Sequence, residues 1–227
     1  MKELIRATEK KVAKALHRPA DKVKINSLDI VRESIDARKK PDVKLVYTVD
    51  FEFDGELPFE EAVSREYEYD FGSVDMDALR PVIAGFGPCG IFAALILSEA
   101  GLKPIVLERG KAVEERVKDV RKFRENITVD RVAAVPDPES NVQFGEGGAG
   151  TFSDGKLTTG IKDVRIRKVL GEFVDAGADP VILYKHKPHI GTDRLQEIVK
   201  NLRLRIEELG GEVRFCKIGR ASCRERV

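Results

Sequence analysis

The chain has 227 residues, 42% of them hydrophobic and 35% charged, and this length accommodates one large domain or two ordinary ones. The formal net charge is +1, so charge gives no reason to expect a nucleic acid or an anionic membrane as a partner. The apolar run Ile91 to Leu97 is too short for a membrane span, the charged N-terminus lacks the apolar core of a signal peptide, and the three cysteines show no metal-ligand spacing. We therefore expect a cytoplasmic protein without a metal site.

A small α+β domain is expected over residues 1–78. Residues 2–17 place apolar side chains on one side and charges elsewhere, a pattern that predicts an amphipathic helix. Residues 23–32 and, more regularly, residues 43–53 alternate apolar and polar side chains, which predicts two strands of a sheet with one buried face. Residues 54–78 are acidic and irregular, with a candidate short strand at 67–69, and we interpret them as a linker.

A βαβ unit that opens on a phosphate-binding turn is predicted directly after this linker. Gly85, Gly87 and Gly90 stand in G-x-G-x-x-G spacing between an apolar strand, 81–84, and an apolar helix, 91–100. Gly85 permits the tight turn, Gly87 leaves the backbone open to a pyrophosphate, and Gly90 lets the helix pack close to the strand. The N–H groups at the start of the helix would bind the phosphates. The alternative is a plain βαβ turn without a ligand.

The second strand of this unit, Pro104 to Leu107, ends in the carboxylate of Glu108. An acidic side chain at this position accepts hydrogen bonds from a ribose hydroxyl and would repel the 2′-phosphate of NADP, so FAD and NAD remain as candidates. Arg109 could lie over the adenine or pair with a phosphate. The alternative is that Arg109 is a solvated side chain at the end of the strand. Cys89 stands where a helix start favours a thiolate, but we prefer to interpret it as a small side chain beside the pyrophosphate rather than a redox group.

A second glycine-rich stretch, residues 141–160, reads NVQFGEGGAGTFSDGKLTTG. Its glycines permit positive φ and close approach of the backbone, so we interpret it as a nest of backbone donors, with a flexible surface loop as the alternative. The second domain is expected to span residues 79–217. Its remaining segments predict a charged surface helix, a polar loop, two further helices and a last strand, at 112–123, 126–140, 163–176, 192–209 and 212–217.

With both glycine-rich stretches located, the chain resembles the uncharacterised FAD-dependent dehydrogenases of bacteria and archaea, which belong to the enzymes with a glutathione-reductase-like FAD/NAD(P)-binding fold. The resemblance implies an α/β protein in which a Rossmann-like FAD-binding domain, incomplete here, follows the small α+β domain. It rests on the segments SIDARKK (34–40), VYTVD (46–50), GFGPCGIFAALILSEAGLKPIVLERG (85–110), NVQFGEGGAGTFSDGKL (141–157) and KPHIGTDRL (187–195).

The resemblance implies an FAD-dependent oxidoreductase that acts on a small-molecule substrate, with NAD(P)H as a candidate electron donor. It assigns the adenosine half of FAD to the first turn and the pyrophosphate and flavin edge to the second loop, where Lys156 would stabilise negative charge on the reduced flavin. It identifies no catalytic residue. The expected cofactor-binding residues are Gly85, Gly87, Pro88, Cys89, Gly90, Glu108, Arg109, Gly147, Gly148, Gly150, Thr151, Ser153, Asp154 and Lys156.

Two other classes of function stay open. One is an NAD-binding protein without flavin, and the other is a non-catalytic nucleotide-binding or sensing module whose residues 1–78 contact a partner. A nucleic-acid role for these residues is disfavoured, because Tyr47 and Phe51 fall on the buried side of the alternation and leave no paired stacking surface. His189 is a candidate contact to substrate or flavin, although we prefer a structural histidine bonded to the backbone.

The C-terminal end of the chain departs from the family pattern. Residues 218–227, IGRASCRERV, match a translated sequencing adapter, so a non-native tail is expected there. The family continues with a substrate-side domain and a returning FAD segment. Residues 1–217 are therefore expected to be the N-terminal fragment of a longer enzyme and to be inactive in isolation.

Overall fold

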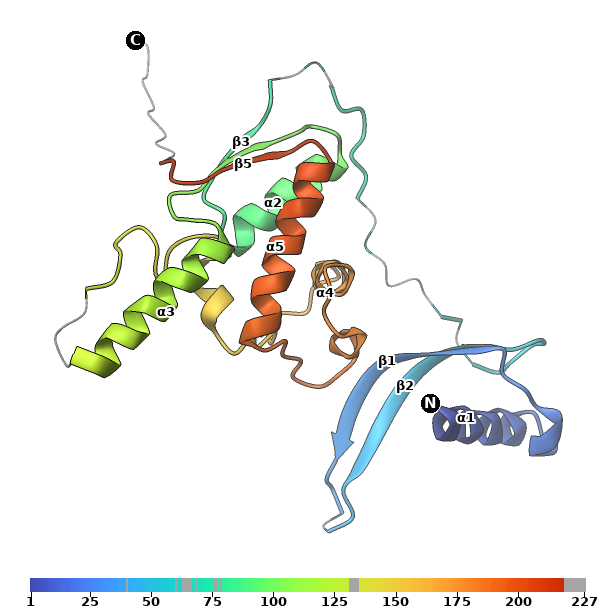
Figure 1. Ribbon diagram of the computed structural model, residues 1–227. Coiled ribbons are helices and arrows are strands. Elements are labelled where there is room, and N and C mark those ends of the chain that lie inside the picture. Colours follow the sequence, from blue (N-terminus) through green and yellow to red (C-terminus); the bar gives the residue numbers. More distant parts are fainter. Residues whose placement is uncertain are drawn as a thin grey trace. The chain divides into compact units, whose positions relative to one another are not determined.

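The computed structural model of the chain describes residues 1–39, 41–59, 61, 62, 67, 69–75, 77, 79–130 and 135–218, and of residues 126–130 the backbone only. The elements in chain order (Figure 1) are α1 (Lys2–Ala15), η1 (Ala20–Lys22), β1 (Ser27–Asp36), β2 (Lys44–Glu52), β3 (Val82–Ala84), α2 (Pro88–Glu99), β4 (Ile105–Leu107), α3 (Val113–Asp130), η2 (Gly148–Phe152), α4 (Arg165–Asp175), η3 (Pro180–Leu183), α5 (Thr192–Glu208) and β5 (Glu212–Arg214). Here η denotes a short 3-10 helix.

The chain divides into two compact units. Unit 1 comprises Met1–Glu66 and Leu183–Pro188, and unit 2 comprises Tyr67–Ile182 and His189–Val227. The division thus falls after residue 66, whereas the sequence suggested residue 78. The segment 183–188 joins unit 1 although it lies within the stretch expected to form the second domain. We describe each unit by itself.

Unit 1 contains α1 and an antiparallel pair of strands, and α1 packs against Phe51 of β2 and residues that flank the strands. β1 and β2 pair from Ser27↔Glu52 to Asp36↔Lys44, with a bulge between Ile30 and Arg32. The alternation of residues 23–32 is loose because Val23 and Ile25 precede β1, which begins at Ser27 and continues to Asp36. The small core comprises Val12, Ala13 and Val23, with Leu16, Phe51, Phe53 and Leu57 packed against them.

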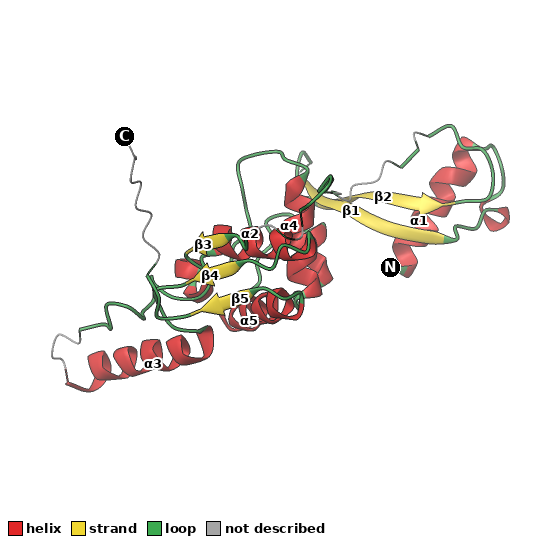
Figure 2. Ribbon diagram, turned by 90° about the horizontal axis from the view of Figure 1, so that it is seen from above, coloured by secondary structure: helices red, strands yellow, loops and turns green. Residues whose placement is uncertain are grey.

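Unit 2 is built on a parallel sheet in the order β3-β4-β5. Figure 2 shows the three strands side by side, and Figure 1 shows α2 and α5 on the same side of the sheet. The βαβ connection predicted from the glycine spacing is present, since β3 and β4 pair in parallel from Val82↔Ile105 to Ala84↔Leu107 with α2 between them in the chain. The described residues therefore form a mixed α/β structure. Three short strands do not distinguish a Rossmann-like FAD-binding domain from other parallel α/β folds, so that assignment stays a prediction.

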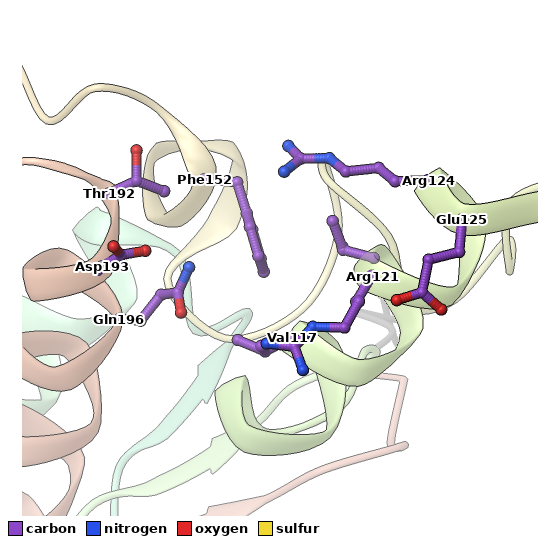
Figure 3. A pocket seen from close by; sticks show the side chains of 9 residues that line it. Val117, Arg121, Arg124, Glu125, Phe152, Thr192, Asp193 and Gln196 are labelled. Carbon is purple, nitrogen blue, oxygen red and sulfur yellow. The ribbon is translucent and has the colours of Figure 1, made fainter. Parts of the chain in front are cut away.

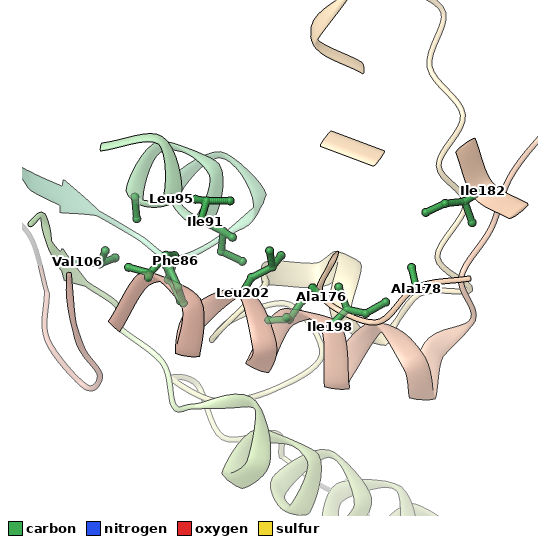
Figure 4. Packing of buried hydrophobic residues seen from close by; sticks show 12 residues of the cluster. Phe86, Ile91, Leu95, Val106, Ala176, Ala178, Ile182, Ile198 and Leu202 are labelled. Carbon is green, nitrogen blue, oxygen red and sulfur yellow. The ribbon is translucent and has the colours of Figure 1, made fainter. Parts of the chain in front are cut away.

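The core of unit 2 lies between α2, α5 and the sheet. Apolar side chains recur every three or four residues along α5 and form one stripe. Helix α2 is apolar on nearly all sides, and Ile91, Ala94 and Leu95 are its buried apolar residues (Figure 4). The buried residues are Phe86, Ile91, Ala94, Leu95, Val106, Ala176, Ala178, Ile182, Ile198, Val199, Leu202 and Ile206. Phe86 lies two residues after the end of β3, so the turn between β3 and α2 is anchored in this core.

Three expectations for unit 2 differ from the structure. Helix α3 continues to Asp130, whereas the charge pattern suggested an end at Phe123 and a loop from residue 126. Tyr67 and Tyr69 belong to no strand; their rings pack edge to face instead. β5 ends at Arg214, three residues before the expected end. The expected tail lies, from residue 219 on, outside the described residues.

Candidate functional site

The turn between β3 and α2 leaves the start of the helix open. Gly85 has φ +92°, a left-handed conformation that favours glycine, and its N–H donates to the carbonyl oxygen of Leu107 at 2.8 Å. Gly87 is the N-cap of α2, Pro88 follows it, and no side chain caps the helix. A Cβ on Gly90 would lie 2.0 Å from the carbonyl oxygen of Gly85, so α2 packs against the turn at a distance that only glycine permits. The glycines at 85 and 90 therefore have the structural roles expected of them.

Glu108 fixes this turn to the next strand. Its carboxylate accepts the N–H of Phe86 at 2.6 Å and the N–H of Gly110 at 2.7 Å, and the residue is 6% exposed. A carboxylate offers about four acceptor positions, and these two N–H groups occupy two of them. The side chain expected to bind a ribose is thus placed beside the glycine turn, where it also holds the backbone.

The second glycine-rich loop meets the first turn. The N–H of Gly147, which has φ +78°, donates to the carbonyl oxygen of Phe86 at 2.8 Å. A Cβ on Gly148 would lie 3.5 Å from Cδ of Pro88 and 3.7 Å from Cα of Gly87. Two segments that are about 60 residues apart in the chain, and that both consist largely of glycine, therefore lie together at the start of α2.

A buried arginine of α3 holds the second loop in place. Arg116 is 0% exposed and donates to the carbonyl oxygens of Asn141, Val142 and Glu146 at 2.7, 2.8 and 2.6 Å. Burial lowers the pKa of its guanidinium to about 10. The guanidinium also lies over the ring of Phe152, 4.8 Å from the centroid. The sequence suggested a charged surface helix here, and it gave no signal that one of these charges turns inward.

Glu146, in the middle of the second loop, is also fully buried. Its carboxylate accepts the N–H of Val113 at 2.7 Å, at the start of α3, and Nε of Arg203 at 2.9 Å. Arg203 also pairs with Glu114 at 2.7 Å. Burial raises the pKa of Glu146, and the Val113 N–H and Arg203 oppose that rise. The sequence interpretation passed over Glu146, although a carboxylate flanked by glycines was a signal that could have been followed.

The hydroxyl groups expected to bind the cofactor are bonded to their own loop. Oγ1 of Thr151 donates to the carbonyl oxygen of Glu146 at 3.0 Å, and Thr151 is 1% exposed. Oγ of Ser153 donates to the carbonyl oxygen of Gly150 at 2.7 Å and accepts the N–H of Gly155 at 3.1 Å. Both side chains shape the loop, and Thr151 is too deeply buried to reach a ligand directly.

The charged candidates lie on the surface. Arg109 pairs with Glu139, with 2.6 Å between Nη2 and Oε1, and this pair lowers the pKa of the Glu139 carboxyl. Lys156 pairs with Asp154 at 3.0 Å, with the two side chains 73% and 63% exposed. Cys89 is exposed in the first turn of α2. Each of these ion pairs would have to open before its charge could serve a bound anion.

Two kinds of feature are absent from the residues that the structure describes. Among these residues, no group of three or more His, Cys, Asp or Glu side chains could hold a metal ion. No helix in the described part of the chain combines the length and the apolar character needed to cross a bilayer.

Comparison with known proteins identifies two similarities. The model of a family described as "Domain of unknown function (DUF8436)" matches residues 3–52. An "Uncharacterized protein" of Clostridium beijerinckii is 47% identical over 218 residues, an alignment that covers 91% of this chain and 39% of the relative. The chain thus spans about two fifths of the length of that curated relative.

These comparisons correct the family assignment made from the sequence. Neither description names an FAD-dependent dehydrogenase, so the assignment to that family was wrong. The motifs that carried it were mainly glycine-rich segments. Such segments recur wherever a backbone makes a tight turn or approaches a phosphate closely, so they report a local geometry rather than a family.

Proposed function

We propose that unit 2 binds a dinucleotide at the start of α2, and that this dinucleotide is FAD. The observation that carries the proposal is the meeting of the two glycine-rich segments, joined by the 2.8 Å hydrogen bond from Gly147 to Phe86. Backbone N–H groups and an uncapped helix start together favour a pyrophosphate. The carboxylate of Glu108, beside the same turn, suits a ribose hydroxyl.

The open backbone at Gly87 supports this proposal. A Cβ on Gly87 would meet nothing within 4 Å, so the backbone faces open space at the N-cap. Gly148 lies close to that position, since a Cβ added to it would come into ordinary van der Waals contact with Gly87 and Pro88. A phosphate at the N-cap would therefore lie beside both segments. The N–H groups of the helix start would supply its donors, because those of Gly147 and Gly148 are already bonded to the carbonyl oxygens of Phe86 and Gly145.

FAD would supply hydride or electron transfer when bound, and the chain would bind, orient and shield it. On this proposal the function is that of an FAD-dependent oxidoreductase with a small-molecule substrate. NAD(P)H is the proposed electron donor. Because the chain spans 39% of its relative, the full activity is proposed for the longer protein.

The test is Gly87→Val, with Gly160→Val as its control. Neither glycine has a neighbour within 4 Å of an added Cβ, and neither has a positive φ, so both variants should fold. A valine at residue 87 should fill the space of the pyrophosphate, and we expect FAD affinity to fall by about a hundredfold or more, while Gly160→Val keeps native affinity. Binding is measured by titrating the folded proteins with FAD and, in parallel, with NAD.

Native FAD affinity in a folded Gly87→Val variant would show that the turn is not the phosphate site. Tight binding of NAD to the native chain without any binding of FAD would favour the NAD-binding alternative instead. Neither result depends on a substrate, so the test can be made before the reaction is identified.

A further inference from the structure

A second candidate site lies within unit 2, away from the N-cap of α2. It is a cavity of about 480 Å³ between α3, η2 and the first turn of α5 (Figure 3). This volume is in the range of sites that hold small organic ligands. None of the residues of the first glycine turn lines it, so it is distinct from the proposed phosphate site.

One wall of the cavity is apolar and aromatic. Val117 and Val120 of α3 line it together with the ring of Phe152. The guanidinium of Arg116 lies over the Phe152 ring, 4.8 Å from the centroid, but does not line the cavity. The ring is thus held from one side by a buried contact and meets the cavity with the rest of its surface. Such a wall suits a flat hydrocarbon or aromatic body.

Helix α3 contributes three charged side chains to the cavity, two arginines and Glu125. Arg121 and Arg124 line the cavity one helical turn apart, and Figure 3 shows Arg124 extending toward Phe152 while Glu125 points away from it. Within the described part of the chain, Arg121 forms no ion pair, so its guanidinium is available to a ligand. Guanidinium groups bind carboxylates through two parallel hydrogen bonds.

The wall formed by α5 adds the start of a helix. Thr192 is the first residue of α5, and no side chain caps this helix either. The partial positive charge of a helix start favours an anion. Asp193 is the negative group on this wall, and it is exposed. The carboxylate of Asp193 would repel an anionic ligand. Its removal by mutation therefore tests whether the ligand is negatively charged.

We propose that this cavity binds a small organic anion with a planar apolar body, of the class of aromatic carboxylates. The body would pack on Phe152 and the valines, and the carboxylate would pair with Arg121. The assignment of this anion as the substrate rests on the proposed function, whereas the binding itself does not.

The test measures benzoate binding to the full chain, without cofactor, by calorimetric titration. Arg121→Gln should weaken binding by about fivefold or more, because it removes a charge-assisted contact. Asp193→Asn should strengthen binding by about twofold, because it removes a like charge. Lys118→Gln is the matched control, since Lys118 is an exposed cation of the same helix that does not line the cavity, and it should leave affinity unchanged.

Three further probes test whether the ligand needs an aromatic ring and a negative charge. Acetate lacks the ring, benzyl alcohol lacks the charge and benzylamine reverses it, so each should bind more weakly than benzoate. Tighter binding of benzylamine, or native benzoate affinity in Arg121→Gln, would overturn the inference. Benzoate should still bind to the Gly87→Val variant. A variant that no longer binds benzoate would show that the cavity belongs to the phosphate site. If the native chain binds benzoate but not FAD, the proposed function is refuted and the inference about the cavity stands.

Discussion

The close approach of α2 to the glycine turn predicts a large difference between two similar substitutions. A Cβ on Gly90 would lie 2.0 Å from the carbonyl oxygen of Gly85 and 3.0 Å from its carbonyl carbon. Carbon and oxygen atoms normally approach to about 3.3 Å, so α2 would have to move by about 1.3 Å. The turn has little freedom to yield, because the N–H of Gly85 is bonded to Leu107 at 2.8 Å and the neighbouring N–H of Phe86 to Glu108 at 2.6 Å.

The magnitude follows from opposing effects. Forcing a methyl group against backbone costs about 3 kcal/mol, and the better helix propensity of alanine returns about 1 kcal/mol. Gly90→Ala should therefore destabilise the folded chain by about 2 kcal/mol and lower its Tm by about 4–8 °C. Gly87→Ala is the control, since nothing lies within 4 Å of its added Cβ, and its stability should stay within about 0.5 kcal/mol of the native value.

Thermal unfolding followed by far-UV circular dichroism suits this pair, because the chain has no tryptophan to report by fluorescence. Two results would refute the reasoning. If Gly90→Ala has the same Tm as the native chain, α2 does not pack on the turn as described. If both variants lose the same stability, the cause is the general loss of glycine and not the contact with Gly85.

Two further predictions concern the buried charges of the second loop. Arg116→Met should destabilise the chain by about 2–5 kcal/mol, because three charge-assisted bonds to backbone carbonyls are lost. This value is a net loss, since the cost of burying the guanidinium is removed at the same time. The substitution of the exposed Lys118 by Met is the control, and faster amide exchange at residues 141–146 is the second readout. Burial raises the folded-state pKa of Glu146 above its ordinary 4.5, so ionisation of this group costs the fold stability as the pH rises through that pKa. Glu146→Gln does not titrate, so its stability relative to the native chain should increase from about pH 4 to about pH 7 in denaturant titrations, and a decrease would contradict the direction of the shift.

The parts of this fold that are set by neighbouring residues could be predicted from the sequence. The turn between β3 and α2 depends on glycines within six residues, because positive φ at Gly85 and close packing at Gly90 are local requirements. The apolar stripes of α1 and α5 likewise follow from the period of a helix. These elements agree with their predicted ranges to within a few residues.

The parts that depend on distant residues could not be predicted. Glu146 is buried because it meets Arg203, 57 residues further along the chain, and the inward turn of Arg116 depends on carbonyl groups at least 25 residues away. A charged side chain in a helix is ordinarily solvated, so nothing in the local pattern of α3 marks this one as internal. Glycine patterns describe where a backbone can approach a ligand, and they left open which partners hold the loop.

The segment Leu183–Pro188 has a consequence for dissecting this protein. It belongs to unit 1, where the carbonyl oxygen of Tyr184 accepts the N–H of Glu33 at 2.8 Å, although the chain on both sides of it belongs to unit 2. No single break in the chain can therefore release unit 1 whole. A piece that ends at Glu66 would present part of the edge of β1 unpaired, and its missing segment would remain with the other piece. Separately produced halves should consequently recover native unit 1 only when mixed, as complementing fragments.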